Sequence, residues 1–342
     1  MLTPGLIPNK EPMIRVGIIL PEDDIISLHI SFSDAQCYEI ETSDHLYPTC
    51  KNTDQLSFNL VDGNLVIPEL KIEDTIIKII PFIPDENPST TLDGITAGRG
   101  FHWEKKIIAS YWGTLEFTVI DGKLMAVNEL PLEQYLKCVA TSEMSAQCPS
   151  EFLKAQTIVA RSWFLANIEQ KHRHLGFDIC NDDCCQRYQG MANCSEASIQ
   201  SADDTFGQVI VHDDKICDAR YSKSCGGITE NFENVWAGDS IPYLVSIKDV
   251  NNSGVAFCSP EIVPEESLKK YMGNVDEKGQ YYRWRYEATQ GELIQSLKDK
   301  RNIESAKIVH LIPERIGDSG RIINLRIEYK DSQDILQSIV IQ

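Results

Sequence analysis

Two consecutive helical segments within residues 130–167 limit the fold of this chain more than any other feature. In the first segment, apolar residues recur at the three- and four-residue spacing of an amphipathic helix. These residues are Leu132, Tyr135, Leu136, Val139 and Ala140. Pro131 and Pro149 each fit the first turn of a helix, a position that tolerates proline. Any fold of this chain must therefore pack two adjacent helices against the structures formed by the flanking sequence.

The sequence before the helical pair is rich in β-branched residues. Residues 13–83 contain several such runs, and Asp62-Gly63 favours a tight hairpin between two of them. Residues 107–128 form a second predicted hairpin around Asp121-Gly122. Residues 90–100 are rich in glycine and threonine and are predicted to be a loop.

After the helical pair, short strands and loops are predicted for residues 201–250, and short helices for residues 266–271 and 291–300. Two further β runs follow near the C-terminus. Because most strands come in hairpins around a helical middle, the predicted class is α+β, a mixed helical and β core with flanking antiparallel β regions.

Composition excludes some partners. The 342 residues include 51 acidic and 32 basic side chains, a net charge of −19, so nucleic acid and anionic membrane surfaces are not expected partners. A neutral polymer such as a glycan is compatible with this charge. No apolar run is long enough for a transmembrane segment, and we recognise no signal peptide at the N-terminus.

Glu143 continues the apolar stripe of the first helical segment. Burial disfavours a charged carboxylate, and the C-terminal end of the helix dipole disfavours it further. Both effects are expected to raise the pKa of Glu143 and to keep it protonated, as a general acid requires. The alternative is an ordinary solvated residue at a helix end.

The second helical segment carries two cations that are seven residues apart, Lys154 and Arg161. They are predicted to share one face of a helix, two turns apart, and the same helix carries an apolar stripe. That stripe comprises Phe152, Ala155, Val159, Trp163 and Ala166. The two cations either line a cleft that begins at Glu143 or belong to an exposed basic face.

Soft metal ligands gather in one segment, residues 172–190. His174, Cys180, Cys184 and Cys185 suit a tetrahedral structural zinc site. Alternatives drawn from the same segment are His172 in place of His174, or an oxygen from Asp178, Asp182 or Asp183. Free thiols, or a disulfide from Cys180 to Cys184 or Cys185, are also compatible with the spacing.

A glycine turn follows at residues 221–230. Gly226 and Gly227 permit positive φ or close backbone approach, and Tyr221, Ser224 and Thr229 offer neutral hydrogen-bonding groups suited to sugar hydroxyls. An ordinary hairpin turn is the alternative.

Together these motifs resemble the stage II sporulation protein D (SpoIID) family, which shares its domain with the amidase enhancer LytB. The family's V-N-x-L-P-L-E-x-Y-L lead stands at residues 127–136, its S/A-E-M turn at 142–144, and its L-K-A-Q-x-x-x-A-R-S/T stretch at 153–162. Its D-x-C-x-x-x-H-C-Q-x-Y-x-G loop matches residues 178–190, and its S-x-G-G-x-T-E turn matches residues 224–230. Shorter matches occur at Val235-Trp236, Pro242-Tyr243-Leu244 and Ser319-Gly320-Arg321.

The resemblance covers roughly residues 100–330 and implies a SpoIID-like catalytic domain at residues 99–342. The antiparallel β region predicted for residues 1–98 precedes it. It implies that Glu143 is the catalytic acid/base and that Lys154, Arg161 and Tyr221 line the cleft. It also implies a structural zinc ion, with Cys184 standing where family members have histidine.

The implied activity is that of a lytic transglycosylase, which cleaves the N-acetylmuramic acid to N-acetylglucosamine bond of peptidoglycan glycan strands. One glutamate first protonates the glycosidic oxygen and then takes a proton from the C6 hydroxyl, giving a 1,6-anhydro product. An enzyme with this substrate is expected to act outside the cytoplasm. The alternative is a non-catalytic, glycan-binding enhancer of a cell-wall amidase.

Overall fold

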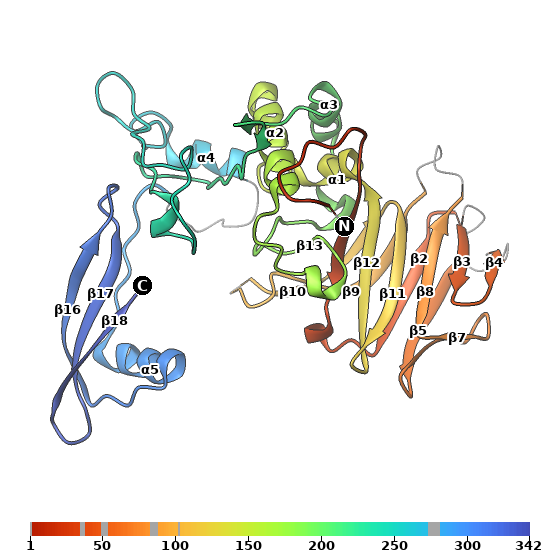
Figure 1. The fold of residues 1–342 in the computed structure, drawn as a ribbon, viewed down its shortest axis with the longest axis horizontal. Helices are drawn as coiled ribbons and strands as arrows, with labels where there is room; N and C mark the ends of the chain where they lie inside the picture. The colour runs from red at the N-terminus through yellow and green to blue at the C-terminus, as the bar shows by residue number, and fades with distance from the viewer. Residues whose placement is uncertain (1, 35–37, 49–53, 83–87, 102, 273–280) are drawn as a thin grey trace. The chain divides into compact units, whose positions relative to one another are not determined.

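The computed structural model describes residues 2–34, 38–48, 54–82, 88–101, 103–272 and 281–342 (Figure 1). The chain forms two compact units. The first comprises Met1–Arg220 with Lys270–Val275, and the second comprises Tyr221–Lys269 with Asp276–Gln342. The sequence-based boundary at 98/99 falls inside the first unit, between two strands that pair with each other.

In its described residues, the first unit contains two large β-sheets and a two-stranded sheet of β14 and β15. The larger has the strand order β13-β1-β12-β11-β8-β3-β4, and the smaller has the order β10-β9-β2-β5-β6-β7. The strands of the larger sheet are β1 (Met13–Ile19), β3 (Tyr38–Thr42), β4 (Leu46–Pro48), β8 (Ile76–Pro81), β11 (Thr114–Ile120), β12 (Lys123–Pro131) and β13 (Ile179–Cys180). Those of the smaller are β2 (Ser27–Phe32), β5 (Gln55–Val61), β6 (Asn64–Ile67), β7 (Ile72–Asp74), β9 (Thr90–Ala97) and β10 (Lys105–Tyr111).

One hydrophobic core lies between the two sheets. Phe58 of the smaller sheet and Phe117 of the larger are both fully buried, and their ring centroids are 4.6 Å apart. Burying such large apolar side chains is the main favourable contribution to folding, at about 25 cal/mol per Å² of apolar surface removed from water. The N-terminal β region and the helical middle of the chain thus share a core.

The N-terminal strand β1 links this β region to the candidate site. It pairs antiparallel with β12, with Met13 opposite Pro131, and parallel with β13, with Gly17 opposite Cys180. A cysteine of the predicted metal segment is therefore held at the edge of the larger sheet.

The loop predicted at residues 90–100 is wrong over most of its length, because Thr90–Ala97 forms strand β9 between β2 and β10. Gly94 has a φ of +88° and lies at an irregularity in the β9–β10 pairing. A glycine within a strand often marks such a bulge, and its presence in the sequence favours a loop when only local composition is considered.

Three helices pack beside the sheets of the first unit: α1 (Leu132–Val139), α2 (Ser150–Ala166) and α3 (Glu196–Asp204). The buried face of α2 differs from the predicted stripe, since Phe152 is 43% exposed while Leu153 and Phe164 are buried. The difference arises because α2 faces α1 and α3 with a surface that includes Arg161, a cation whose burial depends on a partner from another helix.

The second unit begins with a loop-rich region that contains the short helix η6 (Phe232–Asn234). It ends in a three-stranded sheet, β16 (Lys307–Ile316), β17 (Ile322–Lys330) and β18 (Leu336–Ile341). Helix α5 (Gln290–Arg301) packs on this sheet through Leu297, which meets Ile308 and Ile327 in a small core. Helix α4 (Glu265–Met272) crosses the division between the units. The remaining short elements are η1 (Pro21–Asp23), η4 (Arg173–Leu175), η5 (Gly190–Asn193), β14 (Val211–His212) and β15 (Lys215–Ile216).

The protein is therefore an α+β protein, as predicted. None of the helices in the described part of the chain combines the length and the apolar character needed to cross a bilayer.

Candidate functional site

Glu143 lies on the turn between α1 and α2. Its side chain is half-buried, and its Oε1 accepts a 3.0 Å hydrogen bond from the backbone amide of Arg187. The hydroxyl of the preceding residue, Ser142, donates to the carbonyl oxygens of Val139 at 2.9 Å and Arg187 at 2.6 Å. The turn thus holds Arg187 at both its amide and its carbonyl, and the position of the carboxylate is tied to the backbone of a second loop.

This second loop, residues 181–190, is anchored by three buried side chains. The Tyr135 hydroxyl of α1 donates to Gln186 Oε1 at 2.9 Å, and the Gln186 amide nitrogen donates to the Ala160 carbonyl of α2 at 3.2 Å. The Tyr188 hydroxyl donates to Asn128 Oδ1 of β12 at 2.7 Å. The glutamine and tyrosine of the C-Q-x-Y-x-G motif therefore orient Arg187, which stands between them.

Gly190, the last residue of the same motif, has a structural role. Its φ is +56°, and a Cβ at this position would overlap the carbonyl oxygen of Ser110. Only glycine combines this backbone conformation with such close approach. The motif thus packs the loop against β10.

Arg161 does not line a cleft, because its side chain is only 1% exposed. Its Nε and Nη2 donate to the two carboxylate oxygens of Glu133 at 2.8 and 2.6 Å, and its Nη1 donates to the Gln208 carbonyl at 3.0 Å. The Gly207 amide also donates to Glu133, at 3.2 Å. A guanidinium can be buried when a carboxylate meets it in two-point geometry, as here. The sequence pattern contained Glu133 but did not reveal this pairing.

Lys154, on the same helix as Arg161, is partly exposed. Its Nζ forms ion pairs of 3.0 Å with Glu151 of the same helix and with Asp204 of α3. The hydrogen bond with Glu151, followed by that with Asp204, raises the pKa of Lys154. Both predicted cations of α2 are thus paired with carboxylates.

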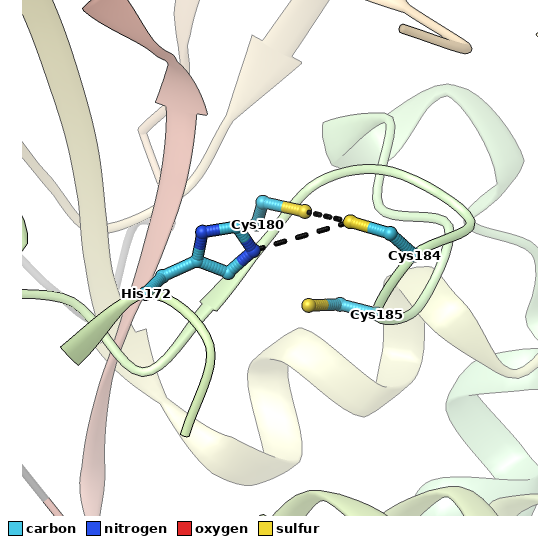
Figure 2. A group of neighbouring side chains, drawn as sticks. All are labelled: His172, Cys180, Cys184 and Cys185. Carbon is cyan, nitrogen blue, oxygen red and sulfur yellow. Dashed lines mark hydrogen bonds between the residues drawn. The ribbon is translucent and has the colours of Figure 1, made fainter. Parts of the chain in front are cut away.

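Three cysteines and one histidine form the candidate metal centre (Figure 2). The ligand atoms of His172, Cys180, Cys184 and Cys185 all lie within 4.8 Å of one another. Cys184 Sγ is 3.1 Å from Cys180 Sγ and 3.9 Å from His172 Nε2. The predicted ligand His174 is not in the group, and the alternative His172 takes its place. The reason is local: both histidines lie within or beside η4, and only His172 stacks on Phe177, with centroids 5.2 Å apart.

Two of the aspartates considered as oxygen ligands are occupied elsewhere. The carboxylate of Asp178 accepts the amides of Leu2 at 3.2 Å and Arg15 at 2.9 Å. Asp182 pairs with the guanidinium of Arg99 and accepts the Gly98 amide at 2.5 Å. These contacts fix the segment on both sides of Cys180, and the group of clustered ligands contains sulfur and imidazole but no carboxylate.

The three thiols interact strongly. Hydrogen bonds from Cys180 and Cys185 lower the pKa of Cys184, while the hydrogen bond to Cys184 raises the pKa of Cys180. The hydrogen bond with Cys180 likewise raises the pKa of Cys185. The lowered pKa of Cys184 favours its thiolate, which is the form that binds metals.

The predicted glycine-turn residues Tyr221, Ser224, Gly226 and Gly227 belong to the second unit, whereas Glu143 belongs to the first. Tyr221 is 37% exposed, and the Ser224 hydroxyl oxygen is buried. Gly227 has a φ of +99°, and a Cβ there would lie 2.8 Å from the Cβ of Ala256. The glycine turn is therefore packed closely within its own unit.

Two motifs that are far apart in sequence hold each other in the second unit. Glu230 accepts hydrogen bonds from the Ser319 hydroxyl, from Asn234 Nδ2 at 2.9 Å and from the Asn231 amide at 3.0 Å. The Arg321 guanidinium donates to the carbonyl oxygens of the glycine turn, at positions 225 and 228. The S-x-G-G-x-T-E turn and the Ser319-Gly320-Arg321 segment thus form one hydrogen-bonded structure.

Comparison with known families gives two matches. Residues 120–212 match the family model described as Stage II sporulation protein (SpoIID), and residues 230–341 match one described as a domain of unknown function (DUF8618). The first match contains Glu143, both cations of α2 and the candidate metal centre. The glycine turn begins after it.

Individual proteins are also similar to this chain, and two of those below carry the names of the family. An uncharacterized protein of Brachyspira hyodysenteriae is 34% identical over 161 residues, which are 47% of this chain and 42% of that protein. The amidase enhancer of Bacillus subtilis is 31% identical over 36% of this chain and 16% of its own length. Stage II sporulation protein D of Bacillus amyloliquefaciens is 28% identical over 36% of this chain and 40% of its own length. This chain thus spans less than half the length of these relatives.

Proposed function

Since the chain belongs to the SpoIID/LytB family through its domain at residues 120–212, we propose that it acts on peptidoglycan glycan strands as a lytic transglycosylase. The family relationship supports a role at the cell wall. The observation that supports catalysis is the placement of Glu143, a half-buried carboxyl group held by the Arg187 amide on a turn pinned at several backbone positions.

In the proposed reaction, the Glu143 carboxyl group protonates the oxygen of the bond from N-acetylmuramic acid to N-acetylglucosamine. That bond breaks as an oxocarbenium-like species forms at C1 of the muramic acid. The Glu143 carboxylate then takes the proton of the C6 hydroxyl, whose oxygen bonds to C1 and closes a 1,6-anhydro ring. Glu143 is thereby protonated again, while its first proton leaves on the released hydroxyl of N-acetylglucosamine, so no water is consumed and the enzyme is regenerated.

The Arg187 amide has a defined role in this cycle. A backbone N–H donated to a carboxylate oxygen stabilises the charged form that the second step requires. Its fixed position also orients the carboxyl group, which lowers the entropic cost of the first proton transfer.

The test uses purified glycan strands without stem peptides. We expect wild type to release 1,6-anhydro products detectable by mass spectrometry, and Glu143→Gln to lose activity by two orders of magnitude or more while keeping its circular dichroism spectrum. Glu151→Gln, an exposed carboxylate on α2, is the matched control and should remain active. Wild type that binds strands without forming anhydro products would contradict the transglycosylase proposal.

The second candidate is a non-catalytic enhancer of a cell-wall amidase, favoured by similarity to a relative named amidase enhancer. It predicts glycan binding without products and faster turnover by an added N-acetylmuramoyl-L-alanine amidase. Glu143→Gln should then stimulate the amidase as well as wild type does.

We also propose that zinc is held by His172, Cys180, Cys184 and Cys185. The donor set of three sulfurs and one imidazole fits zinc, and four protein ligands close a tetrahedral site without an open position. Zinc would supply a cross-link between η4, β13 and the start of the 181–190 loop. Its role would thus be structural, supporting the loop that carries Arg187.

A further inference from the structure

The loop between β9 and β10 carries two aromatic side chains, Phe101 and Trp103. The rings of Phe101 and Trp103 are stacked with centroids 6.2 Å apart and planes inclined by 24°. Phe101 is 41% exposed, although a phenylalanine gains free energy by burial. Neither residue lies within the matched SpoIID segment, which begins at residue 120.

The base of this loop is rigid. Arg99 pairs with Asp23 through two 2.6 Å hydrogen bonds and also pairs with Asp182 of the 181–190 loop. Partial burial opposes the charge of Arg99, but hydrogen bonds with Asp23 outweigh it and raise its pKa. Gly98 lets the Trp103 ring lie against the backbone, since a Cβ there would be 2.6 Å from the ring. The aromatic pair is thus presented from a fixed support.

Arg187 connects the aromatic pair to Glu143. Its guanidinium lies over the Trp103 ring, 5.0 Å from the centroid, while its backbone amide donates to Glu143. Arg187 thus contacts both the aromatic pair and the candidate catalytic carboxyl group.

We infer that Phe101, Trp103 and Arg187 form a sugar-binding subsite that positions an N-acetylated amino sugar of the glycan strand beside Glu143. The C–H groups of a pyranose ring pack against the electron-rich faces of aromatic rings. The Arg187 guanidinium donates to an acyl or carboxylate oxygen on the same sugar. Because Arg187 contacts both the Trp103 ring and Glu143, a glycan strand bound in this subsite also runs past the Glu143 carboxyl group.

This inference rests on the proposed glycan substrate but not on turnover. The subsite is therefore tested by binding, using the full chain with Glu143→Gln as the parent so that strands remain intact. The probe is purified peptide-free glycan strands, and the dissociation constant is measured by isothermal titration calorimetry. Anhydro products are measured separately with the wild type.

We expect Phe101→Ala and Arg187→Gln each to weaken binding about tenfold, since a contacting aromatic or arginine side chain commonly contributes more than 1 kcal/mol. Trp103→Phe keeps a ring and should weaken binding less than Trp103→Ala. Phe206→Ala is the matched control, because Phe206 is a 57% exposed phenylalanine of the same unit outside this cluster. Circular dichroism of every variant should match that of the parent.

The outcomes separate the two proposals. If Phe101→Ala and Arg187→Gln bind as tightly as the parent, the subsite is wrong whatever the activity of the wild type. If both weaken binding while the wild type forms no anhydro product, the subsite stands and the transglycosylase proposal fails. A parent that does not bind the strands contradicts both.

Discussion

The Glu133–Arg161 ion pair joins α1 to α2 inside the first unit. Both side chains are buried, and the guanidinium is satisfied by Glu133, by the Gln208 carbonyl and by the hydroxyl of Thr205. Removing one member of a buried pair leaves the other charge without compensation, whereas replacing both by apolar residues often costs little. A single substitution at Glu133 or Arg161 should therefore cost more stability than one in an exposed ion pair on the same helix.

We predict that Arg161→Met lowers the free energy of unfolding of the first unit by about 3–5 kcal/mol. Urea denaturation followed by tryptophan fluorescence measures the effect. The double variant Glu133→Leu with Arg161→Met should recover most of the loss, and Lys154→Met should change stability little because Lys154 is solvated. A double variant less stable than Arg161→Met alone would disprove the coupling.

Sequence reasoning identified Glu143 and Arg161 as unusual but misplaced Arg161. Helical periodicity indicates which residues share a face, and it cannot show that a carboxylate 28 positions earlier neutralises a cation on that face. The choice between His172 and His174 failed for a similar reason, since spacing allowed both and packing against Phe177 separates them. Tertiary partners decided both cases.

At the scale of elements, the 172–185 segment offers a matched test of the proposed zinc site. We predict that purified wild type holds one zinc ion per chain, and that His172→Ala lowers both zinc content and melting temperature, by several degrees. His174→Ala should leave both unchanged because the His174 side chain is exposed and outside the cluster. Zinc content is measured by atomic absorption. Equal losses in the two variants would contradict the ligand assignment.

The 181–190 loop gives a second prediction at this scale. Gly190 and Gly176 both have positive φ, but only a Cβ at Gly190 would meet other atoms, including the Ser110 carbonyl. Gly176→Ala should therefore cost only the backbone strain of about 1–2 kcal/mol, and Gly190→Ala clearly more. Because Gly190 lies three residues after Arg187, Gly190→Ala should also reduce cleavage of glycan strands. Equal effects of both variants on stability and activity would argue against this role of the loop.

The sequence predicts well the elements that have clear periodicity and turn residues. It does not predict those that depend on packing against distant parts of the chain. Helices α1, α2 and α5 and the hairpin of β11 and β12 follow from periodicity and turn residues. Helix α3 was missed because its sequence is polar and its apolar contacts are few, and it is fixed by the Ser195 capping box and by packing on α1 and α2.

At the scale of the whole molecule, the two units differ in what stabilises them. The first has a large core between two sheets, while the second has a small core under α5 and a loop region held by polar contacts such as those of Glu230. Partial burial would raise the pKa of Glu230, but hydrogen bonds from Ser319 and Asn234 outweigh it and lower the pKa to about 2. The second unit is therefore expected to be the more sensitive to acid.

The direction of this pH dependence follows from linkage. The lowered pKa means that ionised Glu230 contributes its full stabilisation above its usual pKa of 4.5, and that this contribution is lost as the pH falls from 4.5 towards 2. Glu230→Gln should therefore destabilise the second unit at pH 6 and flatten its loss of stability between pH 4.5 and 2. Glu233, on the short helix η6 that follows Glu230, forms none of these hydrogen bonds, so Glu233→Gln should retain the wild-type profile. Thermal unfolding followed by calorimetry at several pH values measures both, because a transition of the second unit alone should move while that of the first does not. An identical pH profile for Glu230→Gln and wild type would show that these hydrogen bonds do not stabilise the unit.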